Sequence, residues 1–322
     1  KIRKEAEEKR GKEKLAAEGM QSSFSSSRDK ATSPVSSTSS PAPEPKPPAQ
    51  VLKAEVSRLV GSDHPCQVVA FMGAKHGVGN TTVALNTAGV LAAKYKVLFI
   101  EVNERYPATS YLFEFRNMIT GLEVAAQSVR IGEPGKIDAM IEHAEKKKCP
   151  PNLHFLPFSH SVLIAEKENR NEVLDVDGLN GILSYLLEKN YYDYIFVDIQ
   201  PDDRYVGEGL LDGRLVSDSV FFTITQDVHS IACADYKKHQ MEEKFPSLLK
   251  DLNYVVNSYE PDCKMLIPQI ANVLDVAESV VVPISLDYAR LIDSSLEGEI
   301  YAKDKYGEAF LRIVEKVMPA SE

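Results

Sequence analysis

VVAFMGAKHGVGNTTV, the stretch from Val68 to Val83, decides how the rest of the chain is interpreted. Its first part, Val68 to Met72, is apolar and rich in β-branched side chains, which predicts a buried strand. The next residues form a loop with three glycines, Gly73, Gly77 and Gly79. A helix-patterned segment then opens at Thr81. Strand, glycine loop and helix in this order can direct loop N–H groups and the positive end of a helix at a phosphate chain.

The loop differs from the phosphate-binding pattern GxxxxGK[ST] at a position that carries charge. Ala74 takes the place of the first glycine, while Gly79 and Thr81 match. Asn80 stands where the pattern has lysine, and a different lysine, Lys75, lies near the start of the loop. Glycine loops between a strand and a helix also occur in α/β proteins for turn reasons alone, so later segments have to decide between the two interpretations.

Composition narrows the class of protein. The 322 residues allow one large or two ordinary domains, and 43% hydrophobic residues can build a sizeable core. The formal net charge is −10; residues 1–50 carry about +3, so the residues after position 50 carry about −13. An acidic body argues against bulk nucleic-acid binding. The cysteines, without CxxC spacing, indicate neither a disulfide framework nor a metal site: Cys66, Cys149, Cys233 and Cys263.

Three regions follow from the sequence. Residues 1–20 are a charged arm, helical or disordered, and residues 21–64 are a Ser/Pro-rich linker and lead-in that cannot bury enough apolar surface to fold. We expect a separate domain before the linker. Residues 65–322 are expected to form the folded domain, and the glycine loop within it makes nucleotide binding its expected task. No apolar run reaches the length of a membrane span, and a cytoplasmic location is expected.

Apolar segments separated by helical patterns predict a doubly wound, mostly parallel sheet with helices on both faces. The helices are expected after Thr81, over 177–189 and near the C-terminus. The expected strands cover residues 68–72, 96–102, 152–158, 192–201, 217–225, 252–257 and the stretch after Val280.

The strand YDYIFVDIQP, Tyr192 to Pro201, ends in an acid, Asp198. An apolar strand followed by aspartate is a Walker B element, in which the carboxylate holds a magnesium-bound water beside the phosphates. With the hydroxyl of Thr81, Asp198 is the predicted magnesium site. An acid at a strand end can also simply cap a loop, so that interpretation stays open.

Taken together, these segments resemble the MinD and ParA family of deviant Walker ATPases over about residues 66–318. Lys75 occupies the place of the signature lysine in the pattern KGGxGKT[ST], and Glu101 and Asn103 match an acidic DxD strand end. Residues 104–107 carry a shorter likeness to bacterial tyrosine kinases. The segments NLHFLPF, SDSVFFTIT and LNYVVN, and the closing pattern with Pro283 and Gly298, also resemble the family.

The resemblance implies ATP or ADP with Mg²⁺ as cofactors. It implies Lys75, Asp198 and Glu101 as catalytic residues and Asn257 as the adenine contact, although an asparagine at a strand end is also a good turn former. The other residues implied to bind nucleotide are Gly77, Val78, Gly79, Asn80, Thr81, Thr82 and Pro283.

Replacement of the common lysine by Asn80 is similar to the TadZ and CpaE branch, which localises pilus secretion machinery. This implies a nucleotide-dependent homodimer that recruits proteins of a secretion, pilus or cell-pole system. Loss of a lysine–phosphate contact should cost about 1.5–3 kcal/mol of binding and impair turnover more. The alternative is a working MinD- or FlhG-like ATPase or a kinase-like enzyme.

Two expectations concern Lys75 and the C-terminal helix. Nothing in the local sequence gives Lys75 a partner, so the resemblance implies that it reaches nucleotide across a dimer interface. The helix carries an apolar stripe of Phe310, Ile313, Val314 and Val317. It is expected to be a core element rather than a membrane tail, because its basic and acidic residues balance and attract anionic lipid weakly. Membrane contact is therefore expected to be weak or indirect, with a peripheral place at the inner membrane or cell pole as a further option.

Overall fold

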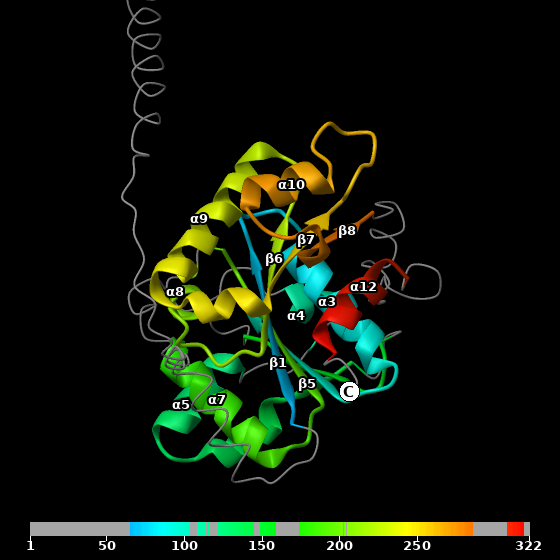
Figure 1. The fold of residues 1–322 in the computed structure, drawn as a ribbon. Helices are drawn as coiled ribbons and strands as arrows, with labels where there is room; N and C mark the ends of the chain where they lie inside the picture. Colours follow the sequence, from blue (N-terminus) through cyan, green and yellow to red (C-terminus); the bar gives the residue numbers. More distant parts are fainter. Residues whose placement is uncertain are drawn as a thin grey trace, which may run out of the picture. The chain divides into compact units, whose positions relative to one another are not determined.

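The computed structural model describes residues 65–103, 108–113, 115, 121–144, 149–158, 174–201, 203, 205–285 and 308–318, all within one compact unit. The predicted arm and linker, the kinase-like residues 104–107 and Gly298 lie outside these ranges. Figure 1 shows a central sheet with helices against both of its faces.

Eight strands form the sheet in the order β3-β4-β2-β5-β1-β6-β7-β8. Every neighbouring pair is parallel except β3 and β4. This confirms the predicted mostly parallel, doubly wound sheet. The strands are β1 (Gln67–Gly73), β2 (Val97–Val102), β3 (Glu142–His143), β4 (Leu153–Leu156), β5 (Tyr194–Ile199), β6 (Ser219–Ile224), β7 (Leu252–Asn257) and β8 (Val281–Ile284).

The central strands are buried on both faces, which is why their sequences are apolar without alternation. In β1, every residue from Val68 to Gly73 is buried. The ring of Phe71 stacks between Phe196 of β5 and Phe221 of β6, with centroids 5.6 and 4.8 Å away. Although β1 and β2 are joined by a helix, they are not neighbours, because β5 lies between them.

One face of the sheet is covered by α3 (Asn80–Ala92) and α12 (Glu308–Val317), which lie to the right in Figure 1. The stripe on α12 is buried there with Phe113 and Phe115, which confirms the prediction of a core helix. α3 packs closely because its sheet-facing residues are small. The buried residues of the α12 stripe are Phe310, Ile313, Val314 and Val317.

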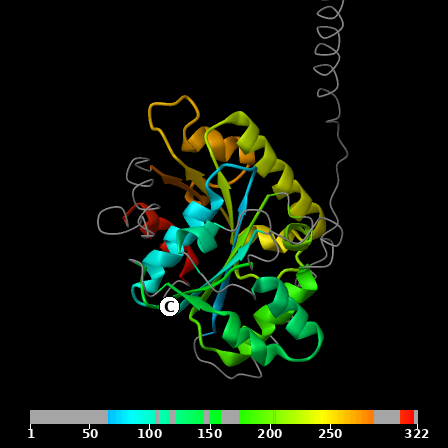
Figure 2. The same ribbon diagram turned by 180° about the vertical axis from the view of Figure 1, so that it is seen from behind.

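The opposite face carries more helices, seen from behind in Figure 2. They are α5 (Leu122–Arg130), α7 (Val176–Lys189), α8 (Val206–Leu211), α9 (Val228–Lys244) and α10 (Ile267–Leu274). The shorter elements are α4 (Ala108–Leu112), η1 (Pro134–Met140), η3 (Pro246–Asp251) and η4 (Glu278–Val280). The second helix that the sequence predicted, 177–189, corresponds to α7.

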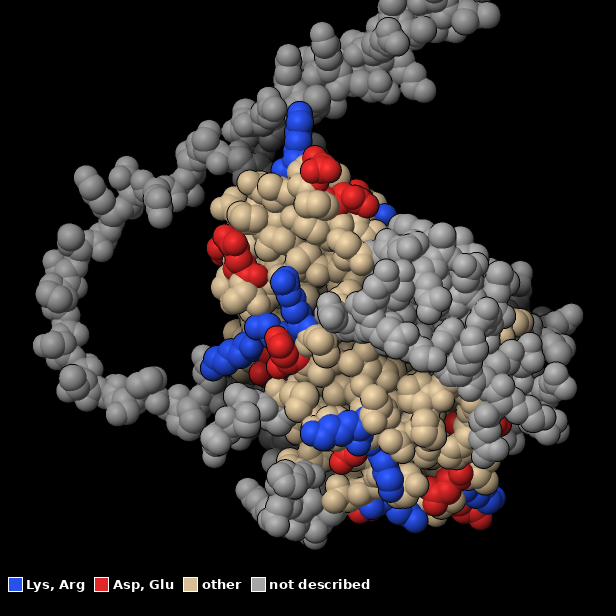
Figure 3. Space-filling model, turned by 90° about the vertical axis from the view of Figure 1, so that its right-hand side faces the viewer, with Lys and Arg blue, Asp and Glu red and all other residues tan. Residues whose placement is uncertain are grey.

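On the side of the molecule shown in Figure 3, acidic and basic side chains are interspersed on the described surface and form no continuous basic area. Within the described ranges, no helix has the length and hydropathy needed to cross a membrane.

Candidate functional site

The carboxyl ends of the parallel strands meet at one edge of the sheet, and the predicted site residues gather there. Asp198 on β5 is in register with Phe71 on β1 and with Glu101 on β2. Gly73, the last residue of β1, is in register with Thr223 of β6. The glycine loop therefore begins between two strands whose ends both carry polar side chains.

Two glycines of the loop have left-handed backbone conformations. Gly77 has φ 76° and Gly79 has φ 81°. A Cβ on Gly79 would lie 2.3 Å from the side-chain nitrogen of Asn257, whereas one on Gly77 would meet nothing within 4 Å. Gly79 also directly precedes α3, whose first N–H groups have no acceptor within the helix. The loop thus has the backbone and the free donors that a phosphate cradle needs.

Asn80 does not face the loop's open side. Its side chain is 6% exposed and donates to an Asp198 carboxylate oxygen at 2.6 Å and to the Phe71 carbonyl at 3.2 Å. The side-chain oxygen of Asn80 accepts from Thr223 Oγ1 at 2.7 Å. These bonds satisfy the amide and hold the start of α3 against β1, β5 and β6.

Thr81 and Asp198 lie together, as the magnesium prediction requires. The Thr81 hydroxyl donates to the second Asp198 oxygen at 2.6 Å. Asp198 is fully buried, and burial raises its pKa to about 6 although Thr81 and Asn80 both donate to it. A hydroxyl and a carboxylate are the hard oxygen ligands that Mg²⁺ prefers. Among the described residues no cluster of three or more His, Cys, Asp or Glu could hold a metal, so phosphates and water would have to complete the coordination of a bound ion.

Glu101 contacts the backbone of α4. Its carboxylate accepts from the N–H groups of Ala108 at 2.6 Å and Thr109 at 2.9 Å, and from the Thr109 hydroxyl at 2.5 Å. Burial raises the pKa of Glu101 to about 7, and the neighbouring Asp198 carboxylate adds to the shift. The structure gives Glu101 a positioning role at the end of β2. Its proposed catalytic part stays a prediction.

Asn257, the predicted adenine contact, lies beneath the glycine loop. Its side-chain nitrogen donates to the Val78 carbonyl at 2.8 Å, and its side-chain oxygen is buried without a partner among the described residues. Pro283 on β8 lies in register with Val256, next to the end of β7. Asn257 thus braces the loop, and the roles of Asn257 and Pro283 toward adenine stay predictions.

Lys75 has a partner within its own chain. Its Nζ lies 3.5 Å from Asp227 Oδ2, and its side chain is 31% exposed. Asp227 also caps α9 by accepting from the Ser230 N–H at 2.9 Å. Burial would raise the pKa of Asp227, but hydrogen bonds from Thr225 and Ser230 and the Lys75 charge lower it. The structure thus gives Lys75 a partner that is close in space but distant in sequence, and its expected reach across a dimer interface stays a prediction.

Comparison with known protein families shows to which family this chain belongs. A model of the AAA_31 family, described as an AAA domain, matches residues 66–235, which is more than half of the chain. The chain belongs to this AAA-domain family. The matched residues run from the start of β1 into α9 and include the glycine loop, Thr81 and Asp198.

Solved structures show that this AAA domain has the fold of the MinD and ParA ATPases. A ParA family ATPase from Chlorobium tepidum has a TM-score of 0.62 and 16% identity, over 80% of this chain and 100% of that chain. MinD from Aquifex aeolicus has a TM-score of 0.61 and 18% identity, over 80% and 99%. An uncharacterized protein of Methanocaldococcus jannaschii is 27% identical over 212 residues, 63% of this chain and 76% of its own.

Two residues of this AAA-domain site escaped the sequence analysis. Thr223 and Asp227 hold Asn80 and Lys75, respectively. Both lie at or just after the end of β6, at the same sheet edge as the glycine loop. The sequence could have indicated them, because the apolar strand in SDSVFFTITQD (residues 217–227) ends in polar residues, and these are expected at the same sheet edge as the glycine loop.

Proposed function

We propose that this protein binds ATP or ADP with Mg²⁺ at the carboxyl edge of the sheet and acts as a nucleotide-dependent dimeric scaffold. The observation that carries the proposal is the contact between Thr81 and Asp198 directly beneath the glycine loop. This contact places a hydroxyl and a carboxylate beside the first amides of α3, which have no acceptor within the helix. Together these groups suit a magnesium-bound phosphate chain.

Two similar structures support the choice of ligand. One is MinD from Pyrococcus horikoshii, complexed with Mg-ADP, at 17% identity and a TM-score of 0.59. The other is a plasmid partition protein from Borrelia burgdorferi bound to AMPPNP, at 19% identity and a TM-score of 0.57. In this chain, the loop from Gly77 to Thr82 would hold the phosphates, and Thr81 and Asp198 would hold the ion, which screens phosphate charge when bound.

Slow or absent turnover follows from Asn80. A neutral amide cannot supply the positive charge that stabilises a phosphoryl-transfer transition state. Its donors are already used by Asp198 and Phe71, so Asn80 also makes no free hydrogen bond to a phosphate. Ground-state binding keeps the backbone amides and the ion, and it should be about tenfold or more weaker than with a lysine.

The dimer part of the proposal rests on Lys75. Its ion pair with Asp227 is half exposed, and such pairs contribute little stability, so the lysine can leave it at low cost. A bound nucleotide on a second copy would then offer Lys75 a stronger partner. A MinC:MinD complex among the similar structures fits a scaffold that recruits other proteins. More specifically, we propose that this protein is a localisation factor of the TadZ and CpaE type for pilus assembly.

A working ATPase is the second candidate. It is favoured by Asp198 and Glu101, which lie side by side on adjacent strands with raised pKa values and could exchange a proton. The two candidates differ in turnover, since only the ATPase releases phosphate in a reaction that Asp198→Ala abolishes.

Calorimetry of the full chain with Mg-ATP tests the proposal. We expect binding in the micromolar to millimolar range and a loss of magnesium dependence in Thr81→Val, with Thr87→Val as the matched control. Thr87 lies further along α3, and its hydroxyl donates to the Val83 carbonyl at 2.8 Å. Absence of binding at millimolar Mg-ATP would reject the nucleotide site. Rapid phosphate release by the wild type would instead establish the ATPase.

A further inference from the structure

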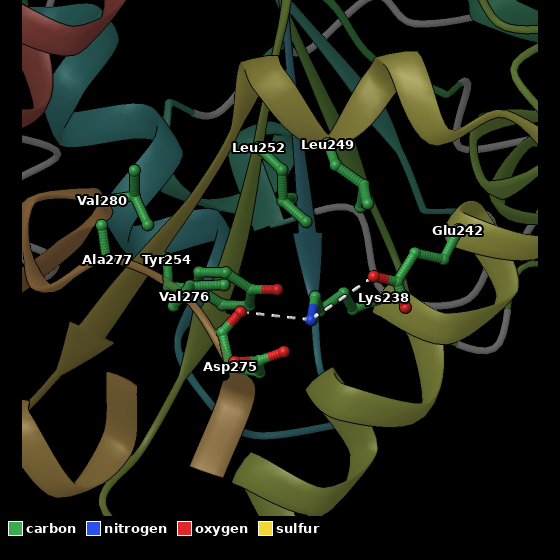
Figure 4. A pocket seen from close by; sticks show the side chains of 9 residues that line it. All are labelled: Lys238, Glu242, Leu249, Leu252, Tyr254, Asp275, Val276, Ala277 and Val280. Atoms are coloured by element: carbon green, nitrogen blue, oxygen red, sulfur yellow. Dashed lines mark hydrogen bonds and ion pairs between the residues drawn. The ribbon is translucent and has the colours of Figure 1, made fainter. Parts of the chain in front are cut away.

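A cavity of about 270 Å³ lies at the other end of β7 from the glycine loop. It is bounded by α9, η3, β7 and the segment between α10 and β8 (Figure 4). Leu252, which begins β7, lines it, whereas Asn257 ends the same strand beneath the loop. Five residue steps along the strand separate Leu252 from Asn257, a distance on the order of 15 Å. The cavity is therefore distinct from the proposed nucleotide site.

A buried hydroxyl without a partner points into this cavity. The side chain of Tyr254 is 0% exposed, and its hydroxyl has no hydrogen-bond partner among the described residues. Its ring packs edge-on against Phe222, with centroids 6.0 Å apart, which fixes its direction. Figure 4 shows the hydroxyl directed toward the Lys238 ammonium. A buried hydroxyl left unpaired is costly, so a missing partner is the simplest account of it.

Lys238 adds a buried cation beside this hydroxyl. Its side chain is 6% exposed, and its Nζ lies 3.4 Å from the Asp275 carbonyl oxygen and 3.7 Å from Glu242 Oε1. Both contacts are longer than ordinary hydrogen bonds to an ammonium, which has three donors. Lys238 and Tyr254 thus present donors to the same space.

The remaining surfaces divide into an acidic rim and an aliphatic wall. Glu242, at 39% side-chain exposure, and Asp275, which is exposed, lie at the mouth. The second oxygen of Glu242 is bonded to His239 Nδ1 at 2.8 Å. The wall consists of Leu249, Leu252, Val276, Ala277 and Val280. The cavity therefore has hydrogen-bond donors at its buried end, apolar sides and negative charge at its entrance.

We propose that this cavity binds a small zwitterion with an apolar side chain, of the class of the aliphatic α-amino acids. The carboxylate accepts from Lys238 and Tyr254, the ammonium faces Glu242 and Asp275, and the side chain lies against the aliphatic wall. A cavity of this size is just below the range for drug-sized ligands, which suits a molecule of few heavy atoms.

The charged groups that line the cavity favour a zwitterion over a simple carboxylate or a simple amine. A simple carboxylate would satisfy Lys238 but would be repelled at the rim by Glu242 and Asp275. A simple amine would leave the Tyr254 hydroxyl without an acceptor and would compete with Lys238 for Glu242. Only a molecule with both a carboxylate and an ammonium group can accept hydrogen bonds at the buried end and also neutralise the negative charge at the entrance.

Three probes with the same branched tail test the proposal on the full chain: L-leucine, isovalerate and isoamylamine. Ligand-observed NMR and calorimetry should show L-leucine binding at least tenfold more tightly than the other two. Tyr254→Phe should weaken L-leucine about tenfold, because a hydrogen bond to a charged group is lost. Glu242→Gln should weaken L-leucine but strengthen isovalerate. Tyr236→Phe, at an exposed tyrosine of the same helix as Lys238, is the control and should change nothing.

Tyr254→Phe keeps the ring and removes only an unpaired hydroxyl, so its unfolding midpoint should equal or exceed that of the wild type. The proposal is overturned if no probe binds at millimolar concentration, if the three probes bind equally, or if Tyr254→Phe leaves L-leucine affinity unchanged. None of these results depends on nucleotide binding, so the proposed function is tested separately.

Discussion

The side-chain amide of Asn80 donates to the Asp198 carboxylate across 2.6 Å, at the position where a phosphate-binding loop ordinarily carries lysine. The residue that replaces the lysine is therefore part of the protein's own hydrogen-bond network rather than a ligand contact. Because Thr81 donates to the other oxygen of the same carboxylate, positions 80 and 81 together fix Asp198 on both sides.

Asn80→Lys is expected to tighten Mg-ATP binding about tenfold or more, because a charged donor becomes available to phosphate. The same ammonium should lower the pKa of Asp198 toward its usual value. Calorimetry against Asn80→Met, which matches the length of the chain without its charge, measures the effect. Equal affinities in the two variants would show that position 80 cannot reach phosphate.

The stability of the protein should decrease as pH rises from about 5 to about 7.5. Asp198 and Glu101 have folded-state pKa values raised to about 6 and about 7, so in this window both hold more protons in the native than in the unfolded state. Together they outweigh His154, whose pKa burial lowers to about 4 and which acts in the opposite direction. Urea unfolding across the window measures the slope. Asp198→Asn should flatten it, and a wild-type stability that rises with pH would contradict the assignment.

The two left-handed glycines should respond differently to alanine. Gly79→Ala combines an unfavourable φ with a Cβ against Asn257, and should cost about 2–5 kcal/mol. Gly77→Ala meets no neighbour and should cost about 1–2 kcal/mol for φ alone. Chemical denaturation compares them directly, and equal losses would mean that the contact with Asn257 yields easily.

Lys75→Ala should abolish ATP-promoted dimerisation and leave the fold intact. Light scattering with and without Mg-ATP gives the readout. Asp227→Asn is the matched control, since it removes the charge that holds Lys75 within the chain but retains a residue suited to cap α9. That variant should still dimerise with nucleotide. A wild type whose mass is independent of nucleotide would refute the dimer.

Phe310→Ala should destabilise the fold by about 3–5 kcal/mol, because the side chain is fully buried between α12 and the sheet. Leu311→Ala, one residue on and 45% exposed, should change stability by about 0.5 kcal/mol or less. Thermal unfolding separates the two. If Phe310→Ala kept wild-type stability but lost binding to anionic vesicles, α12 would be a membrane helix instead.

The sequence allowed the strands to be predicted because each is a continuous apolar run closed by a polar residue. β7 has the predicted bounds, Leu252–Asn257, and the other strands predicted with both bounds differ by one or two residues at an end. The two-residue strand β3, Glu142–His143, was not predicted, because it is too short to form an apolar run. α9 was not predicted because its buried face has only two large apolar residues, Ile231 and Met241, and its other buried residues are small or polar: Ser230, Ala234 and Lys238.

The candidate site was predictable where its members end consecutive apolar strands, as Asp198 does. The partners of Lys75 and Asn80 were not, because Asp227 and Thr223 meet them only through the order of strands in the sheet. Strand order depends on packing between distant segments, so it cannot be predicted from any single stretch of sequence.

The position of β1 between β5 and β6 has a consequence for the folding of the growing chain. Both strands that pair with β1 lie far beyond it in the sequence, and so do Asp198 and Thr223. While the ribosome has made only the first half of the protein, neither neighbour of β1 exists, so the apolar side chains of β1 cannot yet be buried between them. The glycine loop is thus synthesised early and assembled late, so an interrupted chain would contain the motif without the site.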